Sequence, residues 1–228
     1  MQLATTTEPA AWIGERLHPF TQGVGSVIPP GFQAYARVFH PPARLGPDGT
    51  MTLVRWRDIA AANARSIQDE MRRLDISSEP ARFSQQQETL WDQQPLCGHL
   101  PHDIANRLVA ILGGHTSTPE SCWLAVWEGF GGLRIPRHTS SMFSLPNRRY
   151  VLLHGRVADA LLTLSEVDWD YVSPNLWWPD DRAWCVATEI DFTWTYVGGS
   201  RECIQQILDD PALEALPTSA DEGNLMEK

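Results

Sequence analysis

The chain has 228 residues, a formal net charge of −10 and a sequence pI of about 5.1. Its only lysine is Lys228 and its arginines form no basic block, so the sequence disfavours nucleic-acid binding, which needs clustered positive charge. No stretch reaches the roughly 18 apolar residues of a membrane span, and the N-terminus lacks the features of a signal peptide. We therefore expect a cytoplasmic protein that binds neither nucleic acid nor membranes.

The first hundred residues predict short helices and strands. Aromatic and aliphatic residues alternate from Phe32 to His40, which is typical of a strand, and Asp48-Gly49 indicates a hairpin turn. In the helix at residues 10–17, Trp12 and Ile13 are expected to face inward. The expected elements, in chain order, are a loose tail (1–9), a helix (10–17), a strand (32–40), a second strand (51–57), a helix from Asp58 to Leu74 and an exposed loop (77–94).

The rest of the chain also predicts both helices and strands. Gly113-Gly114 ends one predicted helix, and Ser200 is a suitable N-cap for another, with Glu202 in its first turn. The expected elements are a helix (101–112), a strand (122–127), an irregular stretch (135–147), a short strand (150–153), a helix (157–164), two extended segments (183–191 and 192–197), a helix (201–208), a short edge element (213–216) and a tail (218–228).

These elements predict one fold class. Strands and helices are mixed without regular strand–helix–strand alternation, which favours an α+β protein with a mostly antiparallel twisted sheet flanked by helices. No internal repeat or linker divides the chain, so we expect a single domain over residues 10–217 between flexible tails at 1–9 and 218–228.

The segment from Ser173 to Ser200 holds four of the ten tryptophans. Side chains alternate along a strand, so the bulky face of residues 183–191 is expected in the core and the face with Glu189 and Asp191 outside. One interpretation is a core hairpin with solvated carboxylates. The other is a binding site in which one ring of the Trp177–Trp178 pair is exposed. Its predicted members are Trp177, Trp178, Asp180, Asp181, Arg182, Glu189 and Asp191.

Other motifs in the sequence fit a functional site less well. Cys97, His99 and His102 are zinc-type ligands, with His115 as a fourth, but their spacing is not a zinc pattern and favours surface or capping histidines. Gly129–Gly132 lacks the glycine spacing and the following helix of a phosphate-binding loop. The four cysteines form no CxxC pair and are expected to be reduced thiols. We predict no metal and no cofactor.

Three runs of sequence are PNLWWPDDRAWCVATEIDFTWTYVGGS, TPESCWLAVWEGFGGL and DPALEALP. In these runs the chain resembles a group of uncharacterised proteins from high-GC Gram-positive bacteria, over about residues 12–217. The resemblance implies one shared architecture in a bacterial cytosolic setting and assigns no residue roles. Size, acidity and tryptophan content also suit immunity-like proteins.

The sequence therefore predicts a soluble, non-catalytic module that binds a protein partner with a basic surface, or a small ligand, through the loop from Trp177 to Arg182 and the nearby carboxylates. An alternative is a small hydrolase or transferase that uses Glu189 and Asp191 with a histidine or a metal. A third is a purely structural component.

Overall fold

The computed structural model describes residues 1–228 except 21, 68–89, 136–139, 168–170 and 224–228. Within the described residues, nine strands form one sheet in which every pair is antiparallel. This confirms the predicted α+β class. The spatial order is β1 (Gln2–Leu3), β7 (Arg148–Gly155), β5 (Cys122–Trp127), β8 (Leu176–Pro179), β9 (Cys185–Ala187), β10 (Trp194–Gly199), β2 (Ala34–Phe39) and β11 (Ala215–Thr218), with β6 (Met142–Leu145) also paired to β7.

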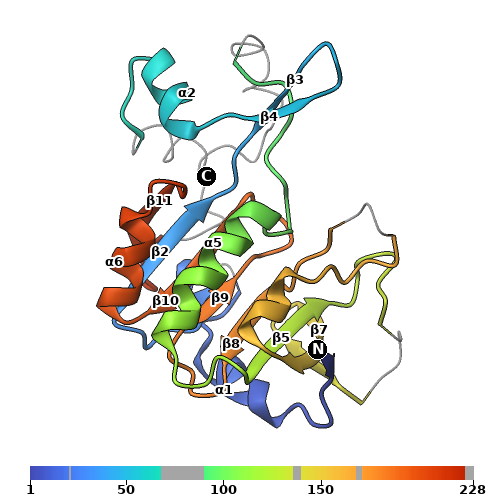
Figure 1. The fold of residues 1–228 in the computed structure, drawn as a ribbon. Helices are drawn as coiled ribbons and strands as arrows, with labels where there is room; N and C mark the ends of the chain where they lie inside the picture. The colour runs from blue at the N-terminus through green and yellow to red at the C-terminus, as the bar shows by residue number, and fades with distance from the viewer. Residues whose placement is uncertain (21, 68–89, 136–139, 168–170, 224–228) are drawn as a thin grey trace.

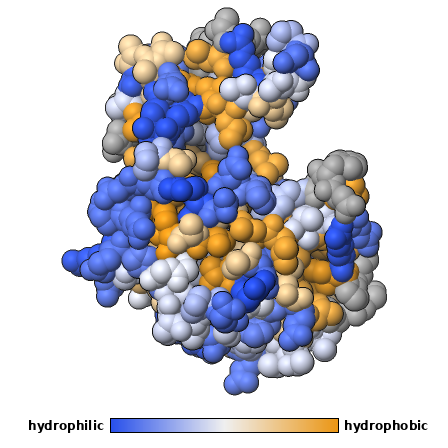
Figure 2. All heavy atoms as spheres, viewed as in Figure 1, coloured by the Kyte–Doolittle hydropathy of each residue, from blue (hydrophilic) through white to orange (hydrophobic). Residues whose placement is uncertain are grey.

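Helices cover one face of this sheet (Figure 1). The covering elements are α5 (His102–Leu112), α6 (Arg201–Asp209) and the 3₁₀ helix η4 (Val157–Leu161). Figure 2, drawn from the same side, shows hydrophilic residues over α6 and hydrophobic residues towards the middle of the face. We call this the helix-covered face, and its core is rich in aliphatic residues such as Leu108, Leu124 and Ile204.

The opposite face packs against the N-terminal segment, which contains η1 (Glu8–Ala10), α1 (Ala11–Arg16) and η2 (Val24–Ser26). Trp12 and Ile13 are buried there, as predicted. We call this the aromatic face, because Tyr35, Trp178 and Tyr196 lie in its core. Covering both faces makes most strand side chains buried, whichever way they point.

A smaller unit extends from one end of the sheet (Figure 1). It comprises the hairpin β3 (Ala43–Leu45) and β4 (Met51–Leu53) and the helix α2 (Trp56–Ala62). The predicted turn at Asp48-Gly49 is confirmed, with Gly49 at φ 83°. The predicted second strand ends at Leu53 rather than Arg57, because the chain enters α2 at Trp56. The predicted helix from Asp58 to Leu74 is wrong at both ends of this segment, because α2 begins at Trp56 and ends at Ala62, where the chain turns and Ala64 takes a left-handed φ of 52°. Residues 68–74 of that prediction and most of the loop predicted at 77–94 fall outside the described residues.

Several predicted elements agree closely with the structure. Strand β5 has the predicted bounds, and α5 and α6 differ from the predicted helices by one residue at one end. The hydroxyl of Ser200 accepts a hydrogen bond from the Cys203 backbone N–H at 3.2 Å, which confirms the predicted N-cap of α6. The predicted edge element near the C-terminus is β11, displaced by two residues.

Other predictions were wrong at their boundaries. Gln2 pairs with His154, so the expected loose tail at residues 1–9 includes a strand. Thr218 belongs to β11, and Ala220 is buried with its carbonyl accepting from Gly25, so the expected C-terminal tail begins later than 218. The irregular stretch at 135–147 contains β6, and the helix predicted at 157–164 is the shorter η4. No helix among the described residues is long and apolar enough to cross a membrane.

Candidate functional site

The predicted site residues do not form one site. The hairpin β8–β9 closes at residues 180–182, whereas Glu189 and Asp191 follow the far end of β9. Glu189 follows Arg182 by seven positions, and extended backbone advances about 3.3 Å per residue, so the two groups lie at opposite ends of the hairpin. The expectation that the carboxylates converge on the turn is therefore wrong.

Neither Trp177 nor Trp178 is available at the surface. Both side chains are 0 % exposed, which overturns the prediction that one of the two rings is exposed. They do point to opposite faces, as strand geometry requires: Trp177 packs against Trp184 on the helix-covered face and Trp178 packs against Trp12 on the aromatic face. The prediction failed because the sheet is covered on both sides.

The turn at Asp180, Asp181 and Arg182 is exposed and firmly held. The Asp181 carboxylate accepts hydrogen bonds from the Thr116 hydroxyl at 2.8 Å and from the Ser117 backbone N–H and hydroxyl, both at 2.7 Å. Partial burial raises the pKa of the Asp181 carboxyl, but the bonds from Ser117 and Thr116 lower it more, so the pKa lies below its ordinary value. Asp181 therefore anchors the turn as an anion.

The other two turn residues contact aromatic rings. Asp180 accepts a hydrogen bond from the Trp123 indole N–H at 2.9 Å. Arg182 has a left-handed backbone, φ 54°, and its guanidinium carbon lies 5.4 Å from the centroid of the Trp12 ring. We call Trp123, Asp180, Asp181 and Arg182 the turn surface. Its aromatic residue is Trp123, a half-buried indole that the sequence predicts only as part of the strand at 122–127, and not Trp177 or Trp178.

A serine–histidine pair borders the turn surface. The Ser121 hydroxyl and His154 Nε2 are 3.0 Å apart, and the His154 ring packs on Trp123 with centroids 4.4 Å apart. Such a distance suits a nucleophile and its base. No described carboxylate contacts the other nitrogen of His154, however, so the third member of a triad is absent from the described residues. The pair was missed in the sequence because the two residues are 33 positions apart.

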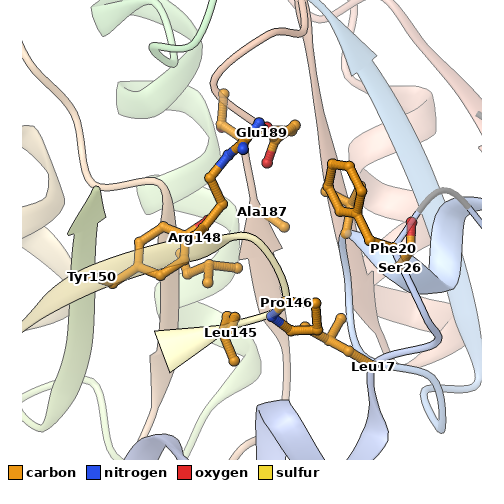
Figure 3. A pocket seen from close by; sticks show the side chains of 12 residues that line it. Leu17, Phe20, Ser26, Leu145, Pro146, Arg148, Tyr150, Ala187 and Glu189 are labelled. Atoms are coloured by element: carbon orange, nitrogen blue, oxygen red, sulfur yellow. Dashed lines mark hydrogen bonds and ion pairs between the residues drawn. The ribbon is translucent and has the colours of Figure 1, made fainter. Parts of the chain in front are cut away.

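At the other end of the hairpin, one arginine holds both predicted carboxylates. Arg148 Nη2 lies 2.7 Å from Glu189 Oε1 and 2.9 Å from Asp191 Oδ2. Figure 3 shows the Arg148 side chain extending towards Glu189, with Phe20 and Ser26 on the facing wall. The Arg148 guanidinium also lies 5.6 Å from the Phe20 ring centroid. No pattern in the sequence indicates this arginine, which lies 41 residues before Glu189.

The hollow beside this ionic cluster is small. Its free space is about 20 Å³, which is room for about one water molecule. Burial raises the pKa of the Glu189 carboxyl above its ordinary value, although the hydrogen bond and positive charge of Arg148 oppose the shift. The cluster is therefore better suited to holding β6, β7 and the end of β9 together than to enclosing a substrate.

The candidate metal ligands do not converge. Cys97 is exposed and its thiol lies 3.6 Å from the Ile190 carbonyl oxygen, while His102 packs edge-on against Tyr171. His99 packs on Phe130 with ring centroids 4.2 Å apart, and His115 hydrogen-bonds Gln206 at 2.8 Å. Within the described part of the chain, no three His, Cys, Asp or Glu side chains are grouped so that they could hold a metal ion.

A buried histidine network was also missed. His40 is fully buried, with Nδ1 2.6 Å from the Leu96 carbonyl oxygen and Nε2 2.9 Å from the Thr195 hydroxyl. Because a carbonyl only accepts, Nδ1 carries the hydrogen and Nε2 accepts from Thr195, whose oxygen then accepts from Thr188 at 2.7 Å. Burial lowers the pKa of His40 to about 4, so the ring is neutral and structural near pH 7.

Fold and site together define an α+β protein whose antiparallel sheet is covered on both faces and carries a rigid, charged turn at one end. Comparisons of the chain with protein-family models, with curated proteins and with solved structures found no match.

Proposed function

We propose that the protein is a non-catalytic module that binds a protein partner through the turn surface. The observation that carries the proposal is the exposed turn itself, which is fixed by hydrogen bonds from Thr116, Ser117 and Trp123. A loop that is both exposed and rigid loses little conformational entropy on binding. A partly exposed tryptophan beside charged groups is a common anchor in protein interfaces.

The partner that we propose has a predominantly basic surface. The chain carries a net charge of −10, which attracts basic proteins over a distance and speeds their association. Asp180 lies at the rim of the turn surface, where it can meet such a partner. A small-ligand role is less well supported, because the hollow beside Glu189 holds about one water molecule.

The alternative of a hydrolase or transferase is also less well supported. Glu189 and Asp191 share the Arg148 guanidinium, so neither is a free base. No described histidine is hydrogen-bonded to either carboxylate.

Quantitative affinity capture tests the proposal. The full chain is immobilised, exposed to lysate of the producing organism, and compared with Asp180→Asn, which removes an exposed negative charge of the turn surface and keeps the side-chain oxygen that accepts from Trp123. We expect at least one basic protein to be recovered with the wild type and depleted about tenfold with Asp180→Asn, which corresponds to about 1.4 kcal/mol of binding free energy. Its recovery should also fall as salt increases.

Asp191→Asn is the matched control, because Asp191 is a charged residue at the opposite end of the hairpin with a side chain that is 73 % exposed. Its capture profile should equal that of the wild type. If every captured protein is recovered equally with the wild type and with Asp180→Asn, the turn surface is not the binding surface and the proposal is wrong.

A further inference from the structure

The β3–β4 hairpin, which extends from one end of the sheet (Figure 1), carries an exposed apolar face. Leu45 lies opposite Met51, and Ala43 lies opposite Leu53. Residues that lie opposite each other, or two apart in one strand, share a face, so Leu45, Met51 and Leu53 point to the same side. These three side chains are 46 %, 57 % and 53 % exposed, so a short hairpin leaves three large apolar groups in water.

One edge of this hairpin is closed and the other is open. The Ala43 N–H donates to the Gln93 carbonyl and the Gln93 N–H donates to the Ala43 carbonyl, both at 2.9 Å, so the outer edge of β3 is occupied. Among the described residues, no segment pairs with the outer edge of β4. An open strand edge presents backbone donors and acceptors that another strand can pair with.

The hydrogen bonds of the hairpin determine which backbone groups of β4 face the open edge. On the side of β3, the Thr50 carbonyl accepts a bond of 2.8 Å and the Val54 N–H donates a bond of 2.9 Å. Residues that face the neighbouring strand alternate with residues that face away along an antiparallel strand. The N–H and C=O groups of Met51 and Leu53 therefore point to the open edge.

We propose that β4 is a contact through which two copies of this chain associate, with the two strands paired antiparallel about Thr52. In this register Met51 of one copy lies opposite Leu53 of the other, and the outward backbone groups of both residues meet as hydrogen-bond partners. Thr52 lies opposite Thr52 of the second copy, and such threonine pairs are favourable across strands. The inference goes beyond the proposed function, because it uses no residue of the turn surface.

The charges around β4 favour a second copy of this chain as the occupant. Each copy has a net charge of −10, so most contacts between copies bring like charges together. Residues 50–54 carry no charge. The same register places Gly49 opposite Arg55 of the second copy, which brings the exposed Asp48 towards that arginine. Arg55 lies 3.8 Å from Glu214 but its side chain stays 38 % exposed, so it can attract Asp48.

The size of the contact sets the strength that we expect. A strand pairing of about five residues per copy is much smaller than a stable interface, which takes about 20–30 residues a side. The dimer should therefore be weak and should form only at high protein concentration.

Sedimentation equilibrium of the full chain from micromolar to millimolar concentration tests the proposal. The mass of the wild type should rise from monomer towards dimer. Thr52 lies on the two-fold axis, so Thr52→Lys and Thr52→Glu each place like charges opposite one another. Each variant alone should lose about tenfold in association constant, and an equimolar mixture of the two should recover to within about threefold of the wild type.

Thr5→Lys and Thr5→Glu are the matched controls, because they make the same changes at an exposed threonine outside the hairpin and should associate as the wild type does. Circular dichroism checks that every variant is folded. The proposal is overturned if the wild type stays monomeric throughout, if the Thr52 variants associate as strongly as the wild type, or if their mixture recovers nothing. Asp180→Asn should associate normally, so failure of partner capture and failure of self-association are separate results.

Discussion

The two faces of the sheet differ in the side chains that they bury and in the charged groups at their margins. The helix-covered face packs aliphatic side chains, and its buried polar groups are mostly neutral and hydrogen-bonded: Trp184 donates to the Leu112 carbonyl at 2.9 Å, and His40 is bound to Leu96 and Thr195. The aromatic face instead carries charges at its margins, namely the arginines on Trp12 and the Arg148–Glu189 pair. Both faces therefore bury a core, and they differ in the charged groups that border the aromatic face.

The largest expected effect is on the helix-covered face. Trp184→Ala and Trp177→Ala should each lower the free energy of unfolding by about 3–5 kcal/mol. Both rings are fully buried and pack edge-on against each other, with their centroids 5.2 Å apart. Chemical denaturation followed by circular dichroism measures the loss. A nearly unchanged stability in either variant would contradict the packing described for this face.

Phenylalanine at the same positions separates ring packing from hydrogen bonding. Trp184→Phe removes the donor to the Leu112 carbonyl, whereas Trp177 has no described acceptor for its indole N–H. We therefore expect Trp184→Phe to cost about 1–3 kcal/mol more than Trp177→Phe. Equal costs would mean that the bond to Leu112 contributes nothing.

The tryptophan pair also shows what the sequence could reveal and what it could not. Alternation placed Trp184 and Val186 on one side of an extended segment, and the structure confirms both in the same core. The same rule could not tell which side is solvent, because a sheet covered on both faces buries successive residues. Strands β8 and β9 consist of apolar residues on both sides, and all of these residues are buried.

Local signals were the most reliable. The Ser200 cap and the glycines after α5 locate helix ends through bonds between near neighbours, and these predictions were confirmed within one residue. Contacts between distant segments had no such local signal. Arg148 pairs with Glu189, and Arg182 packs on the Trp12 ring, and no spacing in the sequence predicts these contacts.

The neutral network of the helix-covered face should make the protein sensitive to acid. The pKa of His40 is about 4 in the folded protein against 6.5 in the unfolded chain, owing to burial and then to the nearby His99 charge, with the bond to Leu96 opposing. The unfolded chain therefore binds a proton first as pH falls from 6.5 towards 4, and stability decreases across that window by about 3 kcal/mol in total.

Urea denaturation between pH 7 and pH 5 tests this before most carboxylates titrate. His40→Asn should be less stable at pH 7 because it loses two hydrogen bonds, but its unfolding free energy should change much less with pH than that of the wild type. His115→Asn, which alters a histidine outside the core, should retain the wild-type slope. An unchanged slope in His40→Asn would rule out His40 as the source.

The charged pair of the aromatic face should respond in the opposite direction, and more weakly. The pKa of Glu189 is raised by burial and lowered by Arg148, with a net rise. A carboxyl whose folded pKa exceeds its unfolded value contributes stability below the unfolded pKa of about 4.5, and this contribution is lost as pH rises through the folded value. The difference in unfolding free energy between the wild type and Glu189→Gln, measured from pH 4 to pH 7, should therefore decrease with rising pH.

A difference that grows with pH would mean that Arg148 outweighs burial and that the pair stabilises the fold with Glu189 ionised. Asp191→Asn leaves the Glu189–Arg148 contact in place and should keep the wild-type trend, so the two variants together locate the effect at the buried member of the cluster.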